Sequence, residues 1–213
     1  MLGAAAPPTY PFSERREMLA FVPPAARSVL DVGCGPGGFG QSLRQDDPTR
    51  ELWAVEVEEE VAAGAARFYD RLVVGAFPDA LAGARRTFDC VVFNDVLEHT
   101  VDPWAILRST VAHLAPGGVV VASIPNVRNV SVVADLVVRG NWTYRDIGIL
   151  DRTHLRFFTS RSIRALFADS GFVVEEMSGI NPVGESHFPG PRFWPLVLRE
   201  FAYTGFGVRA VPR

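Results

Sequence analysis

The feature that most restricts the fold of this chain is a glycine cluster that directly follows a short apolar run. Residues 28–32 have the length and composition of a buried strand, and Gly33, Gly35 and Gly37 come immediately after them. Glycine adopts positive φ angles without steric cost and lets the backbone approach a ligand where a Cβ atom would clash. A strand, a glycine turn and a helix in this order are typical of a βαβ unit that binds a ligand at the carboxyl end of its first strand.

Short apolar runs rich in Val, Ile and Leu alternate with amphipathic stretches along most of the chain. The expected strands are 28–32, 52–55, 71–74, 88–93, 119–124, 172–177 and 205–211. The expected helices are 41–45, 61–68, 104–114, 130–138 and 160–170, with Gly171 as the stop of the last one. The predicted fold class is α/β, with a doubly wound, mostly parallel seven-stranded sheet. We expect one domain, 1–213, in which residues 1–27 form an N-terminal cap segment.

Composition excludes several classes of function. With 48% apolar residues, 21% charged residues and a net charge of −3, the chain has no electrostatic preference for nucleic acid. All 21 basic residues are arginine, so Schiff-base chemistry and a lysine general base are excluded. The 2 cysteines are too few for a disulfide scaffold and lack the spacing of a zinc site.

The chain also lacks the sequence features of export and of membrane insertion. Residues 1–11 have no basic region followed by an apolar one, as a signal peptide would, and no apolar run approaches the length of a membrane span. We therefore expect a soluble, cytoplasmic protein with reduced thiols.

Residues beside the glycines restrict the ligand further. Asp31 precedes the loop, and Pro36 stands inside it, where a diphosphate-binding loop would offer another N–H. Glu56 lies at the expected end of the second strand, where a carboxylate can accept both hydroxyls of a ribose. A glycine-rich turn beside a surface glutamate is the alternative. Dinucleotide enzymes share the Gly-x-Gly-x-Gly pattern, so an NAD-dependent oxidoreductase also stays open at this point.

Several blocks of the sequence resemble one superfamily, and they occur in its order. The segment VLDVGCGPGG (29–38) resembles motif I of the class I S-adenosylmethionine-dependent methyltransferases. The later segments FD (88–89), NDVLEH (94–99), DP (102–103) and LAPGG (114–118) resemble further motifs of that superfamily. The resemblance covers roughly residues 10–174. It implies a Rossmann-like fold, S-adenosyl-L-methionine as the cofactor and methyl transfer as the reaction.

The resemblance also implies which residues bind the cofactor. They are Arg15, Asp31, Gly33, Gly35, Gly37, Glu56, Ala76, Phe77, Asn94, Val96 and His99. In this interpretation the glycines, Asn94 and Val96 lie near the methionine part, and Arg15 faces the cofactor carboxylate, with an exposed helix arginine as the alternative. Many relatives carry an aspartate after the third strand for the adenine amino group. This chain has Ala76 and Phe77 there, so backbone groups are expected to replace that aspartate.

Residues 126–158 break the βα rhythm after the fifth expected strand and predict an insertion that covers the acceptor. Trp142 and Tyr144 offer flat faces with polar edges, which suit a sugar ring, and Arg152 adds a hydrogen-bond donor. The segment 148–159 resembles a bacterial subfamily associated with methylation of sugars and polysaccharides. We therefore expect O-methylation of a hydroxyl on a sugar or oligosaccharide acceptor.

The cofactor already activates the methyl group, so the protein must position the acceptor hydroxyl and remove its proton. His154 is the expected general base, with Asp151 beside it, because histidine accepts a proton near neutral pH. A structural histidine that ties the insertion to the sheet is the alternative. A divalent metal ion such as Mg²⁺ is a third interpretation, with Asp95, Asp151, His154 and His99 as ligands that could converge on it.

Other activities stay open for a chain of this pattern. They are N-methylation of an amine, methylation of a phenol or quinone-like molecule, and a cofactor-binding domain without catalysis. The tail holds His187, Phe188, Pro189, Arg192, Phe193, Trp194 and Phe206. These residues could line the acceptor pocket or form the contact of a homodimer, but packing on the domain's own sheet is the preferred interpretation.

Overall fold

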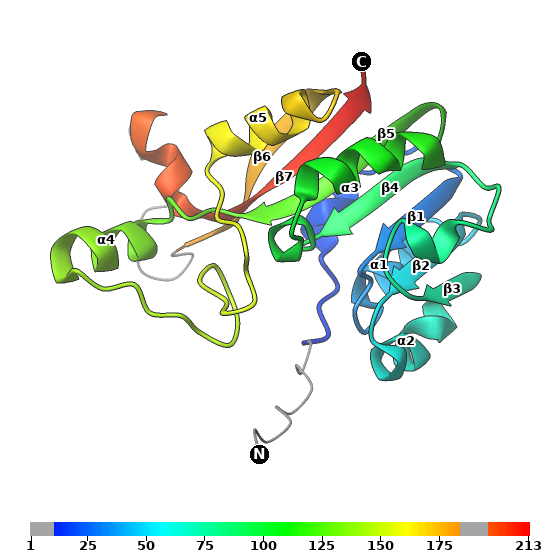
Figure 1. Cartoon of the computed structure of the whole chain (residues 1–213), viewed down its shortest axis with the longest axis horizontal. Coiled ribbons are helices and arrows are strands. Elements are labelled where there is room, and N and C mark those ends of the chain that lie inside the picture. Colours follow the sequence, from blue (N-terminus) through cyan, green and yellow to red (C-terminus); the bar gives the residue numbers. More distant parts are fainter. Residues whose placement is uncertain (1–10, 184–195) are drawn as a thin grey trace.

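A computed structural model describes residues 11–183 and 196–213, and a twisted seven-stranded sheet forms its centre (Figure 1). The strands are β1 (Ser28–Val32), β2 (Glu51–Glu56), β3 (Arg71–Val74), β4 (Phe88–Asn94), β5 (Leu114–Pro125), β6 (Phe172–Pro182) and β7 (Tyr203–Pro212). Their order in the sheet is β3-β2-β1-β4-β5-β7-β6. The pairs from β3 through β5 are parallel, and β7 is antiparallel to both of its neighbours. The predicted fold class, a doubly wound and mostly parallel α/β sheet, is confirmed.

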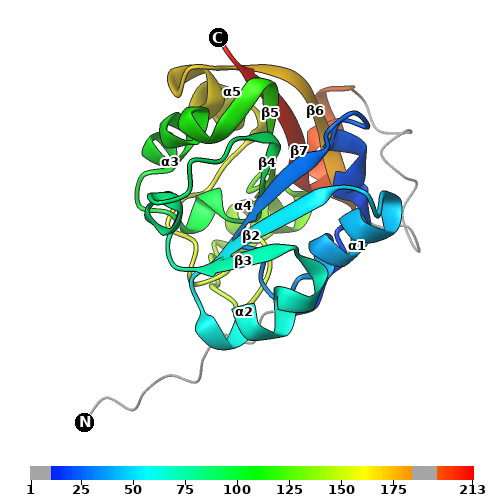
Figure 2. The same ribbon diagram turned by 90° about the vertical axis from the view of Figure 1, so that its right-hand side faces the viewer.

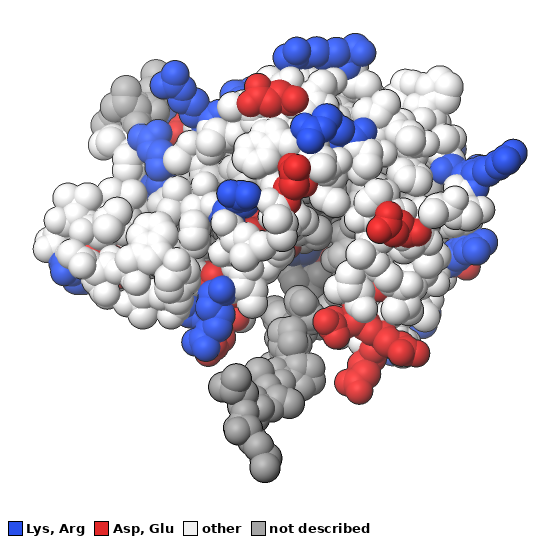
Figure 3. Space-filling model, viewed as in Figure 1, with Lys and Arg blue, Asp and Glu red and all other residues white. Residues whose placement is uncertain are grey.

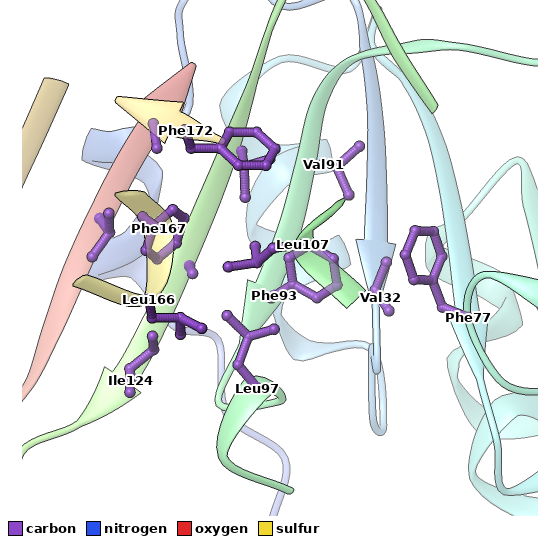
Figure 4. Packing of buried hydrophobic residues seen from close by; sticks show 14 of the residues in the cluster. Val32, Phe77, Val91, Phe93, Leu97, Leu107, Ile124, Leu166, Phe167 and Phe172 are labelled. Carbon is purple, nitrogen blue, oxygen red and sulfur yellow. The ribbon is translucent and has the colours of Figure 1, made fainter. Parts of the chain in front are cut away.

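Helices cover both faces of the sheet, which explains why nearly all residues of its central strands β1 and β4 are buried. The helices are α1 (Gly38–Asp46), α2 (Glu59–Ala65), α3 (Pro103–Thr110), α4 (Val130–Arg139) and α5 (Ser160–Asp169). Figure 2 shows α1 on one side of the strands and α3 with α5 on the other. Successive residues of a strand point to opposite faces. Val91 and Phe93 of β4 therefore belong to the cluster with α3 and α5 (Figure 4), whereas Cys90 and Val92 belong to the cluster with α1.

The order in which strands are added to the sheet reverses between β1 and β4, which lie side by side and run parallel. From β1 the chain winds through β2 to β3 at one edge, and it then crosses back to β4 and continues toward the other edge. In such sheets a ligand binds at the carboxyl ends of the strands where the order reverses. The residues that follow β1 and β4 are therefore those expected to meet a ligand.

The structure differs from the sequence prediction in the length and regularity of the last strands. Strand β5 begins at Leu114, and the Pro116-Gly117-Gly118 segment bulges out within it, because Phe88 pairs with Leu114 while Cys90 pairs with Val119. Strands β6 and β7 extend beyond 172–177 and 205–211 and form one long antiparallel pair. Residues 178–182 have one large apolar side chain, Ile180, and no apolar alternation, so the sequence does not indicate that they are paired.

The predicted insertion leaves the sheet after β5 and returns to it before α5. Asn126 begins it, with its side-chain amide donating to the carbonyl oxygens of Glu200 at 2.8 Å and Tyr203 at 3.1 Å. The insertion contains α4, close to the predicted range 130–138, and α4 extends away from the sheet in Figure 1. Val132 is the buried residue of α4, while Val137 and Val138 are exposed. Figure 3 accordingly shows a largely uncharged surface at this end of the molecule.

The segment that precedes β1 crosses the sheet's carboxyl end and the start of α1. A short 3₁₀ helix, η1 (Arg16–Phe21), buries Met18 and Phe21 against the α1 face of the sheet. Ahead of it, the carbonyl oxygen of Glu14 accepts a hydrogen bond from the Ser42 hydroxyl of α1 at 2.7 Å. These contacts hold residues 14–21 close to the glycine loop.

Candidate functional site

The glycine loop after β1 has the geometry that its sequence predicts. Gly33, Gly35 and Gly37 have φ angles of +69°, +53° and +86°. A Cβ atom on Gly33 would lie 2.7 Å from Val96, and one on Gly37 would lie 2.7 Å from the Phe68 ring. Nothing lies within 4 Å of the corresponding position on Gly35. Two glycines therefore let the loop pack against its neighbours, while Gly35 leaves space for a ligand.

Glu56, at the end of β2, holds this loop through its carboxylate. One oxygen accepts from the backbone N–H of Gly35 at 2.8 Å, and the other accepts from Val57 at 2.8 Å and Glu58 at 3.1 Å. The side chain is buried. A carboxylate offers about four acceptor positions. A ribose diol bound here would use the remaining position and displace one backbone donor.

Asp31 lies beneath the loop, with 1% of its surface exposed. Its carboxylate accepts a hydrogen bond of 2.6 Å from the Tyr69 hydroxyl, and the Tyr69 ring fills the space where a Cβ on Gly40 would lie. Burial raises the pKa of Asp31 to about 7; the Tyr69 hydrogen bond opposes this rise and the charge of Glu56 adds to it. The structure therefore places Asp31 as a support of the loop, although the sequence predicted a cofactor contact.

Arg15 reaches the space between the carboxyl ends of β4 and β5. Its guanidinium pairs with Asp95 and donates to the Ser123 hydroxyl at 2.9 Å and to Glu17 at 2.9 Å. Both Arg15 and Asp95 adopt positive φ angles, +48° and +53°, which are uncommon for residues other than glycine. The alternative of an exposed helix arginine does not fit this position. A cofactor carboxylate would have to compete with Asp95 for this guanidinium.

Asn94 and Glu98 carry most of the buried side-chain polar atoms that lack a hydrogen-bond partner among the described residues. Both amide atoms of Asn94 and both carboxylate oxygens of Glu98 are in this state, and the remaining such atom is Arg86 Nε. Unpartnered buried polar groups are rare in native structures and indicate a group that the protein chain alone does not supply. Asn94 ends β4 beside the glycine loop, so its free amide fits the polar methionine end of S-adenosylmethionine.

The predicted adenine end of the site offers mainly backbone groups. The Phe77 ring is buried in the core, and its centroid lies 5.7 Å from that of Phe93. Figure 4 shows both rings among the buried residues. Ala76 is exposed, and Gly75 ties this segment to β2 through a 2.8 Å bond to the Glu56 carbonyl. The Phe77 side chain is therefore not available to a ligand, which leaves the backbone role that the sequence predicted for Ala76 and Phe77.

On the acceptor side, the insertion brings His154 against the short helix that follows β4. The backbone N–H of Leu155 donates to the Glu98 carbonyl at 2.9 Å, and His154 Nε2 lies 3.9 Å from Glu98 Oε1. His154 Nδ1 lies 3.0 Å from the Ile149 carbonyl oxygen. A carbonyl only accepts, so Nδ1 carries a proton and Nε2 is the ring nitrogen that faces Glu98. Burial raises the pKa of Glu98 well above the ordinary glutamate value.

A chain of hydrogen bonds from Asp151 through Thr153 orients the His99 ring. The Thr153 hydroxyl donates to Asp151 at 2.7 Å, so it accepts from His99 Nδ1, which lies 3.1 Å away. In the neutral ring, His99 Nε2 then carries no proton. The His99 and His154 rings meet edge to face with centroids 4.6 Å apart. Partial burial and the neighbouring His154 lower the pKa of His99, whereas the Thr153 hydrogen bonds outweigh the effect of burial and lower the pKa of Asp151.

The group of residues that could hold a metal ion differs from the predicted one. Ligand atoms of Glu98, His99 and His154 all lie within 4.8 Å of one another. Asp95 is paired with Arg15, and Asp151 accepts from Thr153, so the structure brings neither carboxylate into this group. Glu98 takes their place. It stands inside the NDVLEH motif, but its neighbours in sequence do not show that its side chain is buried against the insertion.

Aromatic side chains of the insertion surround this group. The Phe157 ring contacts Trp142 at a centroid distance of 5.3 Å, Tyr144 at 6.4 Å and His154 at 6.2 Å. Tyr144 is 51% exposed and Trp142 is partly buried. The predicted platform residues therefore share one aromatic cluster with the histidine. Phe157, which the sequence analysis did not single out, joins them.

Among the described residues, Arg152 and Phe206 make their contacts away from this group. Arg152 forms an exposed ion pair with Asp146 at 2.8 Å. Phe206 is buried in the core, as the packing interpretation of the tail predicted. The tail residues outside the described part of the chain are His187, Phe188, Pro189, Arg192, Phe193 and Trp194.

A cavity of about 430 Å³ lies elsewhere, beside Trp53, Arg71 and Arg86. Trp53 pairs with Arg71 at the start of β3, so this cavity lies away from the carboxyl ends of the strands. It is lined by none of the predicted site residues. We therefore locate the functional site from the glycine loop and the unpartnered polar groups instead.

Known proteins resemble this chain in sequence and in fold. The profile of a methyltransferase domain family matches residues 8–177. A relative from Psychrobacter arcticus named ubiquinone biosynthesis O-methyltransferase is 31% identical over 185 residues, which cover 80% of this chain and 66% of the relative. This chain thus spans about two thirds of that relative's length.

Solved structures share the fold at low sequence identity. A S-adenosylmethionine-dependent methyltransferase from Archaeoglobus fulgidus matches with a TM-score of 0.65 at 17% identity, covering 92% of this chain and 90% of the other. An O-methyltransferase from neocarzinostatin biosynthesis, solved with S-adenosylmethionine and 2-hydroxy-5-methyl naphthoic acid, matches with a TM-score of 0.57 at 18% identity, covering 88% and 49%. Within the described residues, no helix has both the length and the apolar character needed to cross a membrane.

Proposed function

Because the chain belongs to the methyltransferase domain family and is a S-adenosylmethionine-dependent methyltransferase, we propose that it methylates a hydroxyl group on a small aromatic molecule. The name of the Psychrobacter relative supports a phenol or quinone-like acceptor, which the sequence analysis had left as an alternative. No comparison supports the sugar acceptor that the sequence analysis preferred.

The observation in this chain that carries the proposal is the aromatic cluster beside the two histidines. Trp142, Tyr144 and Phe157 offer ring faces within the insertion, and Phe157 also contacts His154. Aromatic rings bind one another in offset or edge-to-face arrangements worth about 0.5–1.5 kcal/mol beyond the area that they bury. A planar phenol can therefore stack here with its hydroxyl directed to the histidine pair.

When bound, S-adenosylmethionine supplies a methyl group that its sulfonium charge already activates. The residues of the chain then hold the acceptor ring, exclude water and assist loss of the hydroxyl proton. On the cofactor side, we propose that Gly35, Glu56, Asn94 and Arg15 bind the cofactor, because they combine open space, an acidic group, a free amide and a cation. On the acceptor side, the proton is lost at the group formed by Glu98, His99 and His154.

The test is methyl transfer from labelled S-adenosylmethionine to four acceptors: catechol, methoxyhydroquinone, methyl glucoside and tyramine. We expect the label on the phenolic oxygen of the first two acceptors. Trp142→Ala should raise KM for catechol while leaving the calorimetric affinity for S-adenosylhomocysteine unchanged, and Tyr144→Phe, which keeps the ring, serves as the matched control. Label confined to methyl glucoside, or to the amine of tyramine, would contradict the phenolic acceptor. Cofactor binding without turnover on any acceptor would favour a domain without catalysis.

A further inference from the structure

The cavity beside Trp53 lies near the amino ends of β2 and β3, which form one edge of the sheet (Figure 2). Trp53 pairs with Arg71, the first residue of β3, whereas Glu56, which holds the glycine loop, pairs with Val74. A strand rises about 3.3 Å per residue, so Trp53 is about 10 Å from Glu56 along β2. The cavity volume of about 430 Å³ is within the range of about 300–1,000 Å³ that small-molecule sites have. The lining residues are Trp53, Arg71, Val73, Ala80, Gly83, Ala84, Arg85 and Arg86.

The charged residues that line this cavity are all cations. Arg71, Arg85 and Arg86 belong to the lining, and no acidic residue does, although the chain as a whole has a net charge of −3. Within the described part of the chain, the Arg71 and Arg85 guanidiniums form neither an ion pair nor a hydrogen bond. Arg86 pairs with Glu51, which is outside the lining, but the Arg86 Nε atom is buried and has no partner among the described residues. The lining therefore has a positive charge that its own residues do not balance.

Two aromatic rings hold two of these guanidiniums in place. The guanidinium carbon of Arg71 lies 4.7 Å from the centroid of the Trp53 ring, and that of Arg86 lies 5.9 Å from the centroid of Phe88. The Trp53 and Phe88 rings themselves meet edge to face, with centroids 5.5 Å apart. A guanidinium that lies over a ring face keeps its in-plane N–H groups for hydrogen bonds, and a carboxylate can accept two of them at once. The cavity therefore offers oriented donors to an oxyanion.

The rest of the lining is mainly apolar. Trp53, Val73, Ala80 and Ala84 pack against the core cluster of the α3 face. An inorganic anion gains nothing from apolar walls, whereas the hydrocarbon part of an organic anion gains about 25 cal/mol for each Å² that it buries. Arginine guanidiniums also stack on the aromatic rings of ligands. The lining therefore favours a planar organic anion.

We propose that this cavity binds a small aromatic carboxylate, at a site separate from the one for S-adenosylmethionine and the methyl acceptor. The carboxylate oxygens accept hydrogen bonds from Arg71 and Arg85, and the ring of the ligand lies against Val73, Ala80 and Ala84. Arg86 stays paired with Glu51 and adds its positive charge. The ligand binds without a covalent step, and the site does not depend on the phenolic acceptor.

The test is calorimetric titration of the full chain with 2-naphthoate, in the presence of saturating S-adenosylhomocysteine and catechol so that the other sites are filled. We expect one bound 2-naphthoate per chain. Three compounds that each lack the charge or the aromatic ring should bind at least about 10-fold more weakly: 2-naphthol, octanoate and inorganic phosphate. Arg71→Gln and Arg85→Gln should each weaken 2-naphthoate binding by about 10–100-fold, the range for a lost hydrogen bond to a charged group.

Arg67→Gln is the matched control, because the Arg67 guanidinium also lies 4.7 Å from a ring centroid, that of Phe68, but outside the cavity. This variant should bind 2-naphthoate as the wild type does, and so should Trp142→Ala, which changes the acceptor side. Arg85 is exposed, so Arg85→Gln tests the site even if Arg71→Gln does not fold.

Absence of heat with millimolar 2-naphthoate overturns the proposal, as does unchanged binding in Arg85→Gln. Binding that is lost in Trp142→Ala, or when S-adenosylhomocysteine and catechol are added, would place the ligand in the methyl-transfer site and would also overturn it. Octanoate or phosphate that binds as tightly as 2-naphthoate would contradict the aromatic ligand. Normal 2-naphthoate binding by a chain that methylates no phenol would refute only the proposed function, so the two failures are distinguishable.

Discussion

The Asp31 carboxylate lies beneath the cofactor loop, bonds to Tyr69 and has a strongly raised pKa. Its replacement by asparagine removes the charge. Asp31 is 1% exposed, and its pKa is raised to about 7 from an ordinary value of 3.8, chiefly by burial. Between these two values the native state holds a proton that the unfolded state has released. The stability of the wild type therefore falls as pH rises from about 4 to about 7, and this contribution levels off above pH 7. Asparagine keeps an oxygen that can accept the Tyr69 hydroxyl bond of 2.6 Å and has no charge to bury.

The size of the effect follows from the two pKa values of Asp31. A rise in the pKa from 3.8 to about 7 corresponds to about 4 kcal/mol of folding stability, at 1.36 kcal/mol for each pKa unit. This stability is lost as the pH rises from below 3.8 to above about 7. Between pH 5 and pH 8 the wild type should lose about 2.6 kcal/mol relative to Asp31→Asn. The variant should therefore gain on the wild type as pH rises.

Urea unfolding of both proteins at pH 5, 6, 7 and 8 measures this difference in the free energy of unfolding. Asp70→Asn is the matched control. The pKa of Asp70 is lowered, because hydrogen bonds from Leu52 and Arg44 outweigh its slight burial, so Asp70 stays charged over this range. The gap between that control and the wild type should be constant from pH 5 to pH 8. A constant gap for Asp31→Asn as well would show that Asp31 is ionised throughout, and the reasoning from its burial would be wrong.

Four further substitutions test the loop and its surroundings. Glu56→Ala should weaken calorimetric binding of S-adenosylhomocysteine by about 1–3 kcal/mol, and an unchanged affinity would mean that the ribose is held elsewhere. Gly38→Ala places a Cβ atom 2.1 Å from the Ser13 carbonyl oxygen and should destabilise the protein in urea by about 1–3 kcal/mol. Gly64→Ala, a helix position with open space within 4 Å, should instead gain about 0.5–1 kcal/mol, and equal effects of the two changes would contradict the steric argument. Asn126→Ala removes the side-chain donor to the Glu200 carbonyl, whereas the Tyr203 carbonyl keeps the one from Asn129; the change should cost about 1–3 kcal/mol in the same assay, so near-wild-type stability would show that the insertion is anchored by other contacts.

Properties that depend on neighbours in the chain could be predicted from the sequence. The strand–glycine–helix order around Gly33 requires local backbone conformations, and all three loop glycines have the positive φ angles that this order implies. The apolar run at 88–93 predicted a strand buried on both faces, and β4 is buried along most of its length. The insertion was predicted where the alternation stopped, and α4 lies within it. Each of these inferences uses residues close together in sequence.

The sheet, the loop at its carboxyl end and the methyltransferase family could therefore be predicted from residues that are close in sequence, whereas the contacts between polar residues depend on the folded arrangement of the chain. Asp151 and His154 lie in one short segment, and proximity in sequence suggested a shared catalytic role. In the fold, Asp151 instead orients His99 through Thr153, while His154 meets Glu98, which is 56 positions earlier in the chain and 1% exposed. Strand and turn preferences follow from local sterics, whereas the cost of burying a carboxylate depends on every group that surrounds it. That set of neighbours exists only after the insertion has packed against the end of β4.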